Sequence, residues 1–209
     1  AISGVATVKA VLSGDNVILM GRPSGGPPPE MQLFLSGLIA PKIGRGQGTT
    51  EEPWAYESRE FLRNLLIGKV VNFKIDYKVS QLNFGTITLE NQSVNFSVAR
   101  EGWAKVKPIE NIKEGDPLAN EFEELKKLGK EAEIGKKGIY SGPGNARSII
   151  WTGVKCSALL ASAKGREVLV IIEHVRDGSS LRCMLVNESA MITLGLAGVA
   201  CPRVNAPVA

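Results

Sequence analysis

An internal repeat constrains the fold of this chain more than any other feature of its sequence. Residues 11–17 (VLSGDNV) align with residues 175–181 (VRDGSSL), and residues 35–41 (LSGLIAP) align with residues 196–202 (LAGVACP). The alignment needs one gap, which falls in a stretch rich in Gly and Pro at 21–30. The chain therefore contains two copies of one structural unit.

Each copy begins with the pattern of three strands. In the first copy, the apolar segments 5–12 and 17–20 flank the sequence SGDN, whose residues suit the tight turn of a hairpin. In the second copy, the segments 168–175 and 181–186 flank an equivalent turn at Asp177. A third strand is expected before the Leu-x-Gly-x-x-x-Pro segment of each copy.

A helix is predicted over 51–68 of the first copy. Acidic residues and Pro53 stand at its start and Gly68 at its end, as helix boundaries require. Four positions form one apolar face, namely Phe61, Leu62, Leu65 and Leu66. Arg59 and Arg63 are expected on the opposite, solvent-facing side.

Two more strands and two more helices complete the first copy. Apolar residues alternate with polar ones over 69–77, which predicts a half-buried strand, and a turn at 80–83 leads to a further strand over 84–89. Helices are predicted over 94–101 and 118–134. The expected fold is thus α+β, mainly β, with five strands and three helices.

The repeat also predicts two domains of unequal completeness. The first copy occupies 1–143, and Gly and Pro residues at 142–145 mark the join. The second copy, 144–209, contains only the first three strands. Because three strands cannot close a barrel, we expect the second domain to be partial.

Composition gives no sign of a membrane span or a disulfide framework. The chain has 209 residues, a net charge of +4 and no long apolar run, and it lacks the pattern of a signal peptide, so a cytoplasmic and nuclear location without membrane contact is expected. Its three cysteines form no CxxC pair. The single histidine, His174, has no second histidine or cysteine at ligand spacing, and it is assigned no function.

Several motifs occur in the order of a staphylococcal-nuclease-like domain. They are Leu-x-Gly-x-x-x-Pro, the segment EPWAYESREFL at 52–62, Phe84-Gly85, AREGWAKV at 99–106 and KGIYS at 137–141. The resemblance is restricted to one family by three further features, namely the tandem arrangement, the GGPPP run at 25–29 and the segment 171–178. The chain resembles the N-terminal part of the Tudor staphylococcal nuclease family. This resemblance implies a five-stranded OB-fold barrel and roles linked to RNA silencing, RNA stability and transcriptional co-activation.

The resemblance implies a calcium ion held by carboxylates, a glutamate that activates water and two arginines, but most of these residues do not match. Asp15 matches one metal-binding aspartate. The remaining positions hold Gln32 or Phe34, Ile39, Lys42 and Thr86 in the first copy, and Ser179, Ala200 and Arg203 in the second. Calcium prefers six to eight oxygen ligands. We therefore expect no catalytic residues, no cofactor and no metal, with Asp15 favoured as a turn residue over a calcium ligand.

Cations near the expected cleft are the candidates for binding nucleic acid. Lys42 and Arg203 put a positive charge where the family has a glutamate, which would favour phosphate. The full candidate set is Lys42, Arg45, Lys78, Lys105, Lys107 and Arg203. The segment after Lys107 has no tyrosine on which a base could stack, and the three tryptophans, Trp54, Trp103 and Trp151, are expected in the core.

Three functions remain open at this point. The favoured one is a scaffold module that binds single-stranded or structured RNA, works with protein partners in silencing or transcription complexes and does not cut RNA. The first alternative is a calcium-dependent RNA endonuclease whose site is rebuilt between repeats. The second is a protein-interaction module that does not bind nucleic acid.

Overall fold

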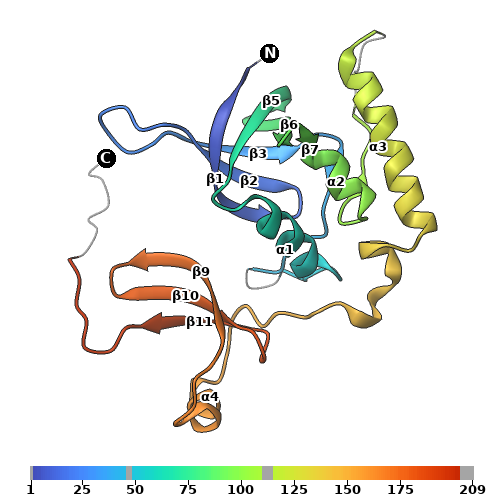
Figure 1. Ribbon diagram of the computed structural model, residues 1–209. Helices are drawn as coiled ribbons and strands as arrows, with labels where there is room; N and C mark the ends of the chain where they lie inside the picture. The colour runs from blue at the N-terminus through green and yellow to red at the C-terminus, as the bar shows by residue number, and fades with distance from the viewer. Residues whose placement is uncertain (1, 46–48, 110–114, 203–209) are drawn as a thin grey trace. The chain divides into compact units, whose positions relative to one another are not determined.

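The computed structural model describes residues 2–45, 49–109 and 115–202. Two compact units are present. The first consists of Ala1–Ile43 and Thr50–Arg147, and the second of Gly44–Thr49 and Ser148–Ala209 (Figure 1). The predicted division between repeats, after residue 143, remains a prediction.

A closed five-stranded barrel forms the centre of the first unit, as the sequence predicts. The strands pair in the order β3-β2-β1-β5-β6, and a parallel pairing of β3 with β6 closes the ring. A short strand, β7, pairs antiparallel with the C-terminal end of β6. The bounds are β1 Ser3–Ser13, β2 Asn16–Met20, β3 Glu30–Leu35, β5 Val70–Val79, β6 Leu82–Leu89 and β7 Gln92–Ser93.

The barrel interior is filled by aliphatic side chains at alternate strand positions. Val8, Val17, Leu33, Val71 and Ile87 are each at most 2% exposed, as expected when every second side chain of a strand points inward. Packing requires glycine at the second position of the Phe84-Gly85 motif, because a Cβ there would collide with the backbone oxygen of Lys74.

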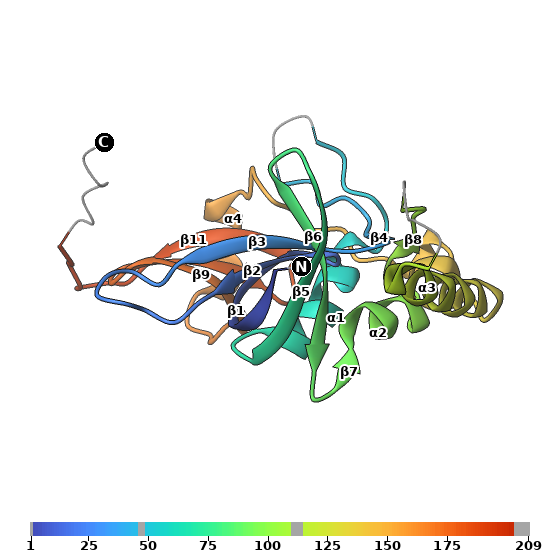
Figure 2. The same ribbon diagram turned by 90° about the horizontal axis from the view of Figure 1, so that it is seen from above.

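Three helices cover the first unit close to the predicted positions. They are α1 Ala55–Leu66, α2 Val94–Arg100 and α3 Pro117–Ile134. The side chains of Ser93 and Asp116 cap α2 and α3 by accepting hydrogen bonds from backbone N–H groups. α1 packs against β1, α2 against β6, and α3 against α2 (Figures 1 and 2).

The predicted solvent exposure of Arg59 is wrong. Its side chain is only 3% exposed, with the guanidinium 5.6 Å from the centre of the Tyr56 ring and 3.1 Å from the Glu60 carboxylate. Arg63 is partly buried beside the same carboxylate. A planar, weakly hydrated guanidinium can be buried against an aromatic ring. A prediction from the apolar positions of the helix alone does not include this contact.

A two-stranded ladder, absent from the sequence prediction, lies beside the barrel. β4 Leu38–Ile39 pairs with β8 Lys105–Val106. The ladder continues past β8 through a 2.8 Å hydrogen bond from the Lys107 N–H to the Gly37 carbonyl. Strands of two residues are too short to show an alternating pattern.

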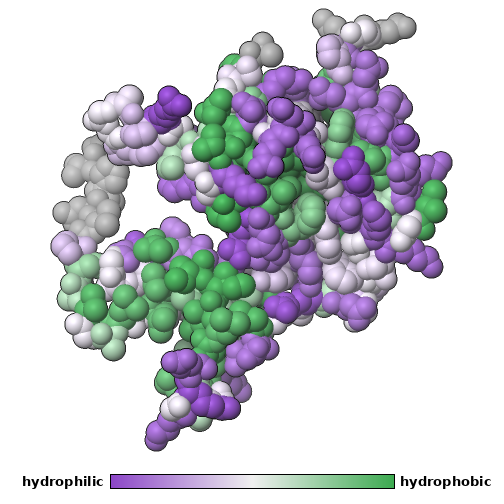
Figure 3. All heavy atoms as spheres, viewed as in Figure 1, coloured by the Kyte–Doolittle hydropathy of each residue, from purple (hydrophilic) through white to green (hydrophobic). Residues whose placement is uncertain are grey.

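The second unit contains the three predicted strands. β9 Val170–Asp177, β10 Ser180–Leu185 and β11 Ala190–Gly195 form an antiparallel sheet in the order β11-β10-β9. An unpredicted helix, α4 Cys156–Ala163, precedes them. Apolar side chains gather over this sheet (Figure 3), and Ile172 and Val175 are 54% and 60% exposed.

All three cysteines are free. Within the described ranges, no helix is both long enough and apolar enough to span a bilayer. Two short 3-10 helices, η1 Gly138–Ser141 and η2 Pro143–Asn145, complete the first unit.

Candidate nucleic-acid interface

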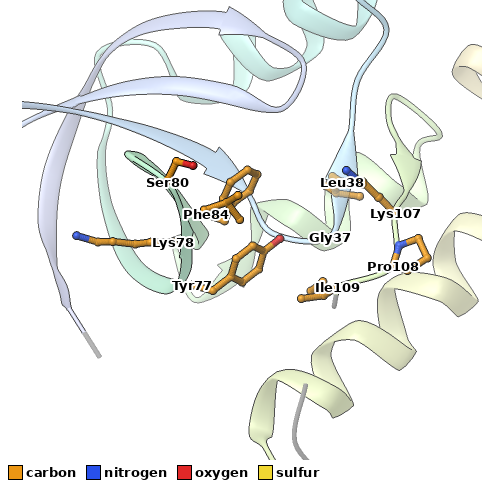
Figure 4. Close-up of a pocket in the computed structure, with 10 residues that line it drawn as sticks. Gly37, Leu38, Tyr77, Lys78, Ser80, Phe84, Lys107, Pro108 and Ile109 are labelled. Carbon is orange, nitrogen blue, oxygen red and sulfur yellow. The ribbon is translucent and has the colours of Figure 1, made fainter. Parts of the chain in front are cut away.

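A pocket of about 710 Å³ lies where β5, β6 and the segments flanking the β4–β8 ladder meet (Figure 4). We call it the aromatic pocket. Its lining consists of Gly37, Leu38, Tyr77, Lys78, Val79, Ser80, Phe84, Lys107, Pro108 and Ile109. Strands and an extended segment therefore supply its walls.

Three stacked rings run from the barrel into the aromatic pocket. Phe34 of β3 stacks on Phe84 of β6 with centroids 5.3 Å apart, and Phe84 stacks on Tyr77 of β5 at 5.0 Å with the rings 8° from parallel. The strand register places these residues directly opposite one another. A register irregularity between Ile75 and Tyr77 in the β5–β6 pair brings Tyr77 opposite Phe84.

Tyr77 presents an uncharged polar ring to the pocket. Burial raises the pKa of its hydroxyl above the usual value of 10.0, the charge of Asp76 adds to this effect, and a hydrogen bond with the backbone of Gly37 opposes it. The phenol therefore remains neutral at physiological pH and does not repel an anion.

Two predicted cations flank these rings. Lys78 extends from β5 and Lys107 from the segment after β8, at opposite ends of the pocket (Figure 4). Both are exposed, and neither ammonium group forms an ion pair or hydrogen bond with another residue that the structure describes. Each remains available to an anionic ligand.

The aromatic rings of the pocket come from strands and not from the segment after Lys107. The segment after Lys107 indeed supplies only Pro108 and Ile109 to the pocket, but strands β5 and β6 supply Tyr77 and Phe84. These rings lie on the apolar sides of predicted strands, where a core role is the usual interpretation.

A second concavity of about 550 Å³ brings two more of the predicted cations together. We call it the proline groove. Its lining consists of Ile39, Ala40, Pro41, Lys42, Glu52, Pro53, Trp54, Lys105, Ile139 and Pro143. Lys42 and Lys105, 63 positions apart in the sequence, thus share one groove.

The β4–β8 ladder links the two concavities. Ile39 pairs with Lys105 across the ladder. Because residues two apart on an extended segment point to the same side, Lys105 and Lys107 project together. Lys107 then lines the aromatic pocket and Lys105 the proline groove.

Two candidates remain, Arg45 and Arg203. Arg45 belongs to the second unit, where its guanidinium lies 5.5 Å from the centre of the Trp151 ring, and its role in binding nucleic acid stays a prediction. Arg203 lies outside the described residues. Trp151 is 8% exposed and Trp103 packs against the core, as predicted, whereas Trp54 lines the proline groove.

Asp15 ties the first turn to the segment after β4. Its carboxylate accepts hydrogen bonds from the Ser13 hydroxyl at 2.5 Å and from the Ala40 N–H at 2.9 Å. Ile39, Lys42 and Thr86 contribute no carboxylate at the other matched positions. These residues do not fit a calcium ion, and the structure groups no three His, Cys, Asp or Glu side chains suitable for a metal within the ranges it describes.

Replacing Asp15 with Ala should lower the free energy of unfolding by about 1–3 kcal/mol, because two donors lose their acceptor. Burial raises the pKa of Asp15 above 3.8, against the opposing effect of its hydrogen bonds with Ser13 and Ala40. For an acid whose pKa is raised on folding, the stabilisation is complete below the unfolded pKa and is lost as pH rises through the folded pKa. Denaturant titrations should therefore show a larger loss at about pH 4 than at about pH 7, and a loss that grows toward neutrality would contradict this role.

Thr86, at the position of a matched arginine, supports the fold. Its hydroxyl donates to the Asp76 carboxylate at 2.9 Å, and the Ser36 hydroxyl donates to the same oxygen at 2.7 Å. The ammonium group of Lys74 lies 3.0 Å from the other Asp76 oxygen and 3.4 Å from Glu121 of α3. This network joins β5 and β6 to the long helix beneath the aromatic pocket.

The turn carboxylate of the second copy is also held by hydrogen bonds, but the Asp and Ser of the turn have exchanged positions. Asp177 stands at the position of Ser13, and Ser179 at that of Asp15. The N–H and hydroxyl of Ser179 donate to Asp177 at 2.8 and 2.9 Å, and the Cys201 thiol lies 3.3 Å from the same oxygen. In both copies the carboxylate is engaged by its own turn.

Together, the closed barrel and the three covering helices define a staphylococcal nuclease-type OB fold. The family model of staphylococcal nuclease homologues matches residues 32–142. The chain belongs to this family and, within it, to the Tudor staphylococcal nuclease proteins.

Curated relatives align with nearly the whole chain. Ribonuclease TUDOR 1 of Arabidopsis thaliana is 38% identical over 95% of this chain and 21% of its own length. Staphylococcal nuclease domain-containing protein 1 of Drosophila melanogaster is 38% identical over 98% of this chain and 23% of its own length, and the Schizosaccharomyces pombe protein of that name is 29% identical over 94% and 23%. The chain thus spans about a fifth of the length of these relatives.

Proposed function

We propose that this chain is an RNA-binding scaffold module whose nuclease site has degenerated. The observation that supports this function best is the aromatic pocket, in which Tyr77 and Phe84 lie between two exposed lysines. Aromatic rings bind unpaired bases by stacking, and lysines neutralise the phosphates that join them.

RNA is the favoured nucleic acid because two relatives are named ribonucleases. Single-stranded or unpaired RNA fits best, since a base must leave its helix to stack inside a pocket. The parent protein's roles in transcriptional co-activation and RNA silencing, its protein partners there and its cytoplasmic and nuclear location are further parts of this proposal, and they rest on the family resemblance.

The names of these relatives also favour a second candidate, a calcium-dependent RNA endonuclease. Such an enzyme needs several hard oxygen ligands and a group that accepts a proton from water. At the matched positions of the first copy, Asp15 is engaged in its turn, while Ile39 and Lys42 supply neither function. This candidate therefore requires residues other than the matched ones.

The salt dependence of RNA binding tests the proposed function against a protein-interaction module. Each phosphate contact with single-stranded RNA contributes about −0.7 to the slope of log affinity against log salt, so the two lysines of the pocket predict affinity about sevenfold lower at about 200 mM than at about 50 mM salt. Fluorescence anisotropy of a labelled oligonucleotide measures the effect. Absence of binding at low salt, or binding insensitive to salt, would contradict the proposal.

A further inference from the structure

The proline groove has a different chemical character from the aromatic pocket. Three prolines, two isoleucines and Trp54 form most of its lining. Ile39 is 41% exposed there, although it lies in a strand whose neighbour Leu38 is 5% exposed. An exposed isoleucine among prolines creates an apolar surface, and a ligand that covers this surface is stabilised by the hydrophobic effect.

Trp54 is held in the groove in a strained conformation. Its φ angle is 69°, which is unfavourable for a bulky side chain, and it occupies the N-cap position of α1 without a side-chain capping bond. Its indole N–H donates to the Gly142 carbonyl at 2.8 Å, and its ring meets Trp103 edge to face at 6.2 Å. Strain of this kind persists where the surroundings enforce it, often at ligand sites.

The charged groups of the groove favour an acidic ligand. Lys42 and Lys105 are exposed at its sides, and neither ammonium group has a partner among the residues that the structure describes. The lining's single acid, Glu52, accepts a hydrogen bond from the backbone N–H of Lys42 at 2.7 Å, while the Glu52 N–H donates to the Lys42 carbonyl at 2.9 Å. This reciprocal pair fixes the loop and leaves both lysine side chains facing solvent.

We propose that the proline groove binds a short, extended protein segment in which apolar residues are flanked by Asp or Glu. The apolar side chains would cover Ile39 and the prolines, and the carboxylates would pair with Lys42 and Lys105. A protein segment is favoured over RNA because most of the lining is aliphatic and the Trp54 indole N–H is already engaged. Prolines and an enforced tryptophan keep the groove rigid, which reduces the entropy lost on binding.

This site is independent of RNA binding in the aromatic pocket. It occupies the region of Ile39, Lys42 and their neighbours, where the resemblance would place calcium and the water-activating glutamate. At these positions the chain has Ile39 and Lys42, which give an apolar groove with positive sides. The groove would let the same module hold a protein while its neighbouring pocket holds RNA.

Peptide selection on the whole chain tests the proposal. Short random peptides displayed on phage are first depleted on the Ile39→Asp variant, which removes binders to other surfaces, and are then selected on the unaltered protein. Enriched peptides should combine apolar residues with Asp or Glu. Ile39→Ser should weaken binding of the synthetic peptides about tenfold or more, because the peptide no longer buries this apolar side chain. Lys42→Gln should weaken binding several-fold.

Lys78→Glu serves as the matched control, because it changes the aromatic pocket and leaves the groove intact. Lys78→Glu should weaken RNA binding and leave peptide affinity within about twofold. Ile39→Ser should weaken peptide binding and leave RNA affinity within about twofold. Thermal unfolding confirms that each variant is folded. The proposal fails if no peptide is enriched, if the enriched peptides are basic, or if Ile39→Ser weakens RNA rather than peptide.

Discussion

Replacing Asn95 with Leu should lower the free energy of unfolding by about 3–4 kcal/mol, the largest loss that we expect from a single polar side chain here. Asn95 is 2% exposed, and its amide accepts a hydrogen bond from the Ile87 N–H and donates to the carbonyls of Ser36 and Gly85. The substitution leaves these buried backbone groups without a partner side chain. Chemical denaturation followed by far-UV circular dichroism measures the loss.

Asn120→Leu provides the control, because Asn120 is exposed on α3. Its free energy of unfolding should change by no more than about 0.5 kcal/mol. Asn95 connects α2 to β6 and to the segment between β3 and β4, so its loss should also loosen the wall of the aromatic pocket. Equal stability of the two variants would show that the Asn95 bonds do not support the barrel.

Reversing both charges of the aromatic pocket with Lys78→Glu and Lys107→Glu should weaken binding of single-stranded RNA by about tenfold to a hundredfold at low salt. Two phosphate contacts are lost, and two new carboxylates repel the backbone. The slope of log affinity against log salt should become shallower by about 1.4. Anisotropy titrations at several salt concentrations measure both quantities.

The matched control is the double variant Lys127→Glu and Lys130→Glu. Both residues are exposed on α3 and line neither concavity, and the change in net charge is the same. This variant should lower RNA affinity only through the general charge of the molecule, by about twofold or less. Equal effects of the two double variants would mean that RNA binds by overall charge and not in the pocket.

Local sequence patterns predict the fold well where the signal extends over several residues. Alternating apolar positions locate β5, and an apolar face with a terminal Gly68 locates α1. The β4–β8 ladder has too few residues for such a signal, and α4 has no polar face to set against its apolar residues. The burial of Arg59 depends on the nearby ring of Tyr56, which only the tertiary structure reveals.

The candidate site is less predictable than the fold. Sequence comparison identifies the lysines and the unmatched carboxylate positions, but it does not indicate that Lys78 and Lys107 line one pocket or that Lys42 and Lys105 line one groove, because these residues come from segments far apart in the sequence. Tyr77 faces the pocket because of a register irregularity in β5. An alternating pattern alone assigns this ring to the core.

Retention and cleavage of labelled single-stranded RNA, scored in the same samples with and without calcium, test the central claim most directly. We predict salt-sensitive retention of intact RNA by the unaltered chain, unchanged by calcium or a chelator and reduced by Lys78→Glu with Lys107→Glu. Calcium-dependent cleavage that is abolished by a chelator and by Asp15→Ala would contradict the account and show that this chain forms an active nuclease site.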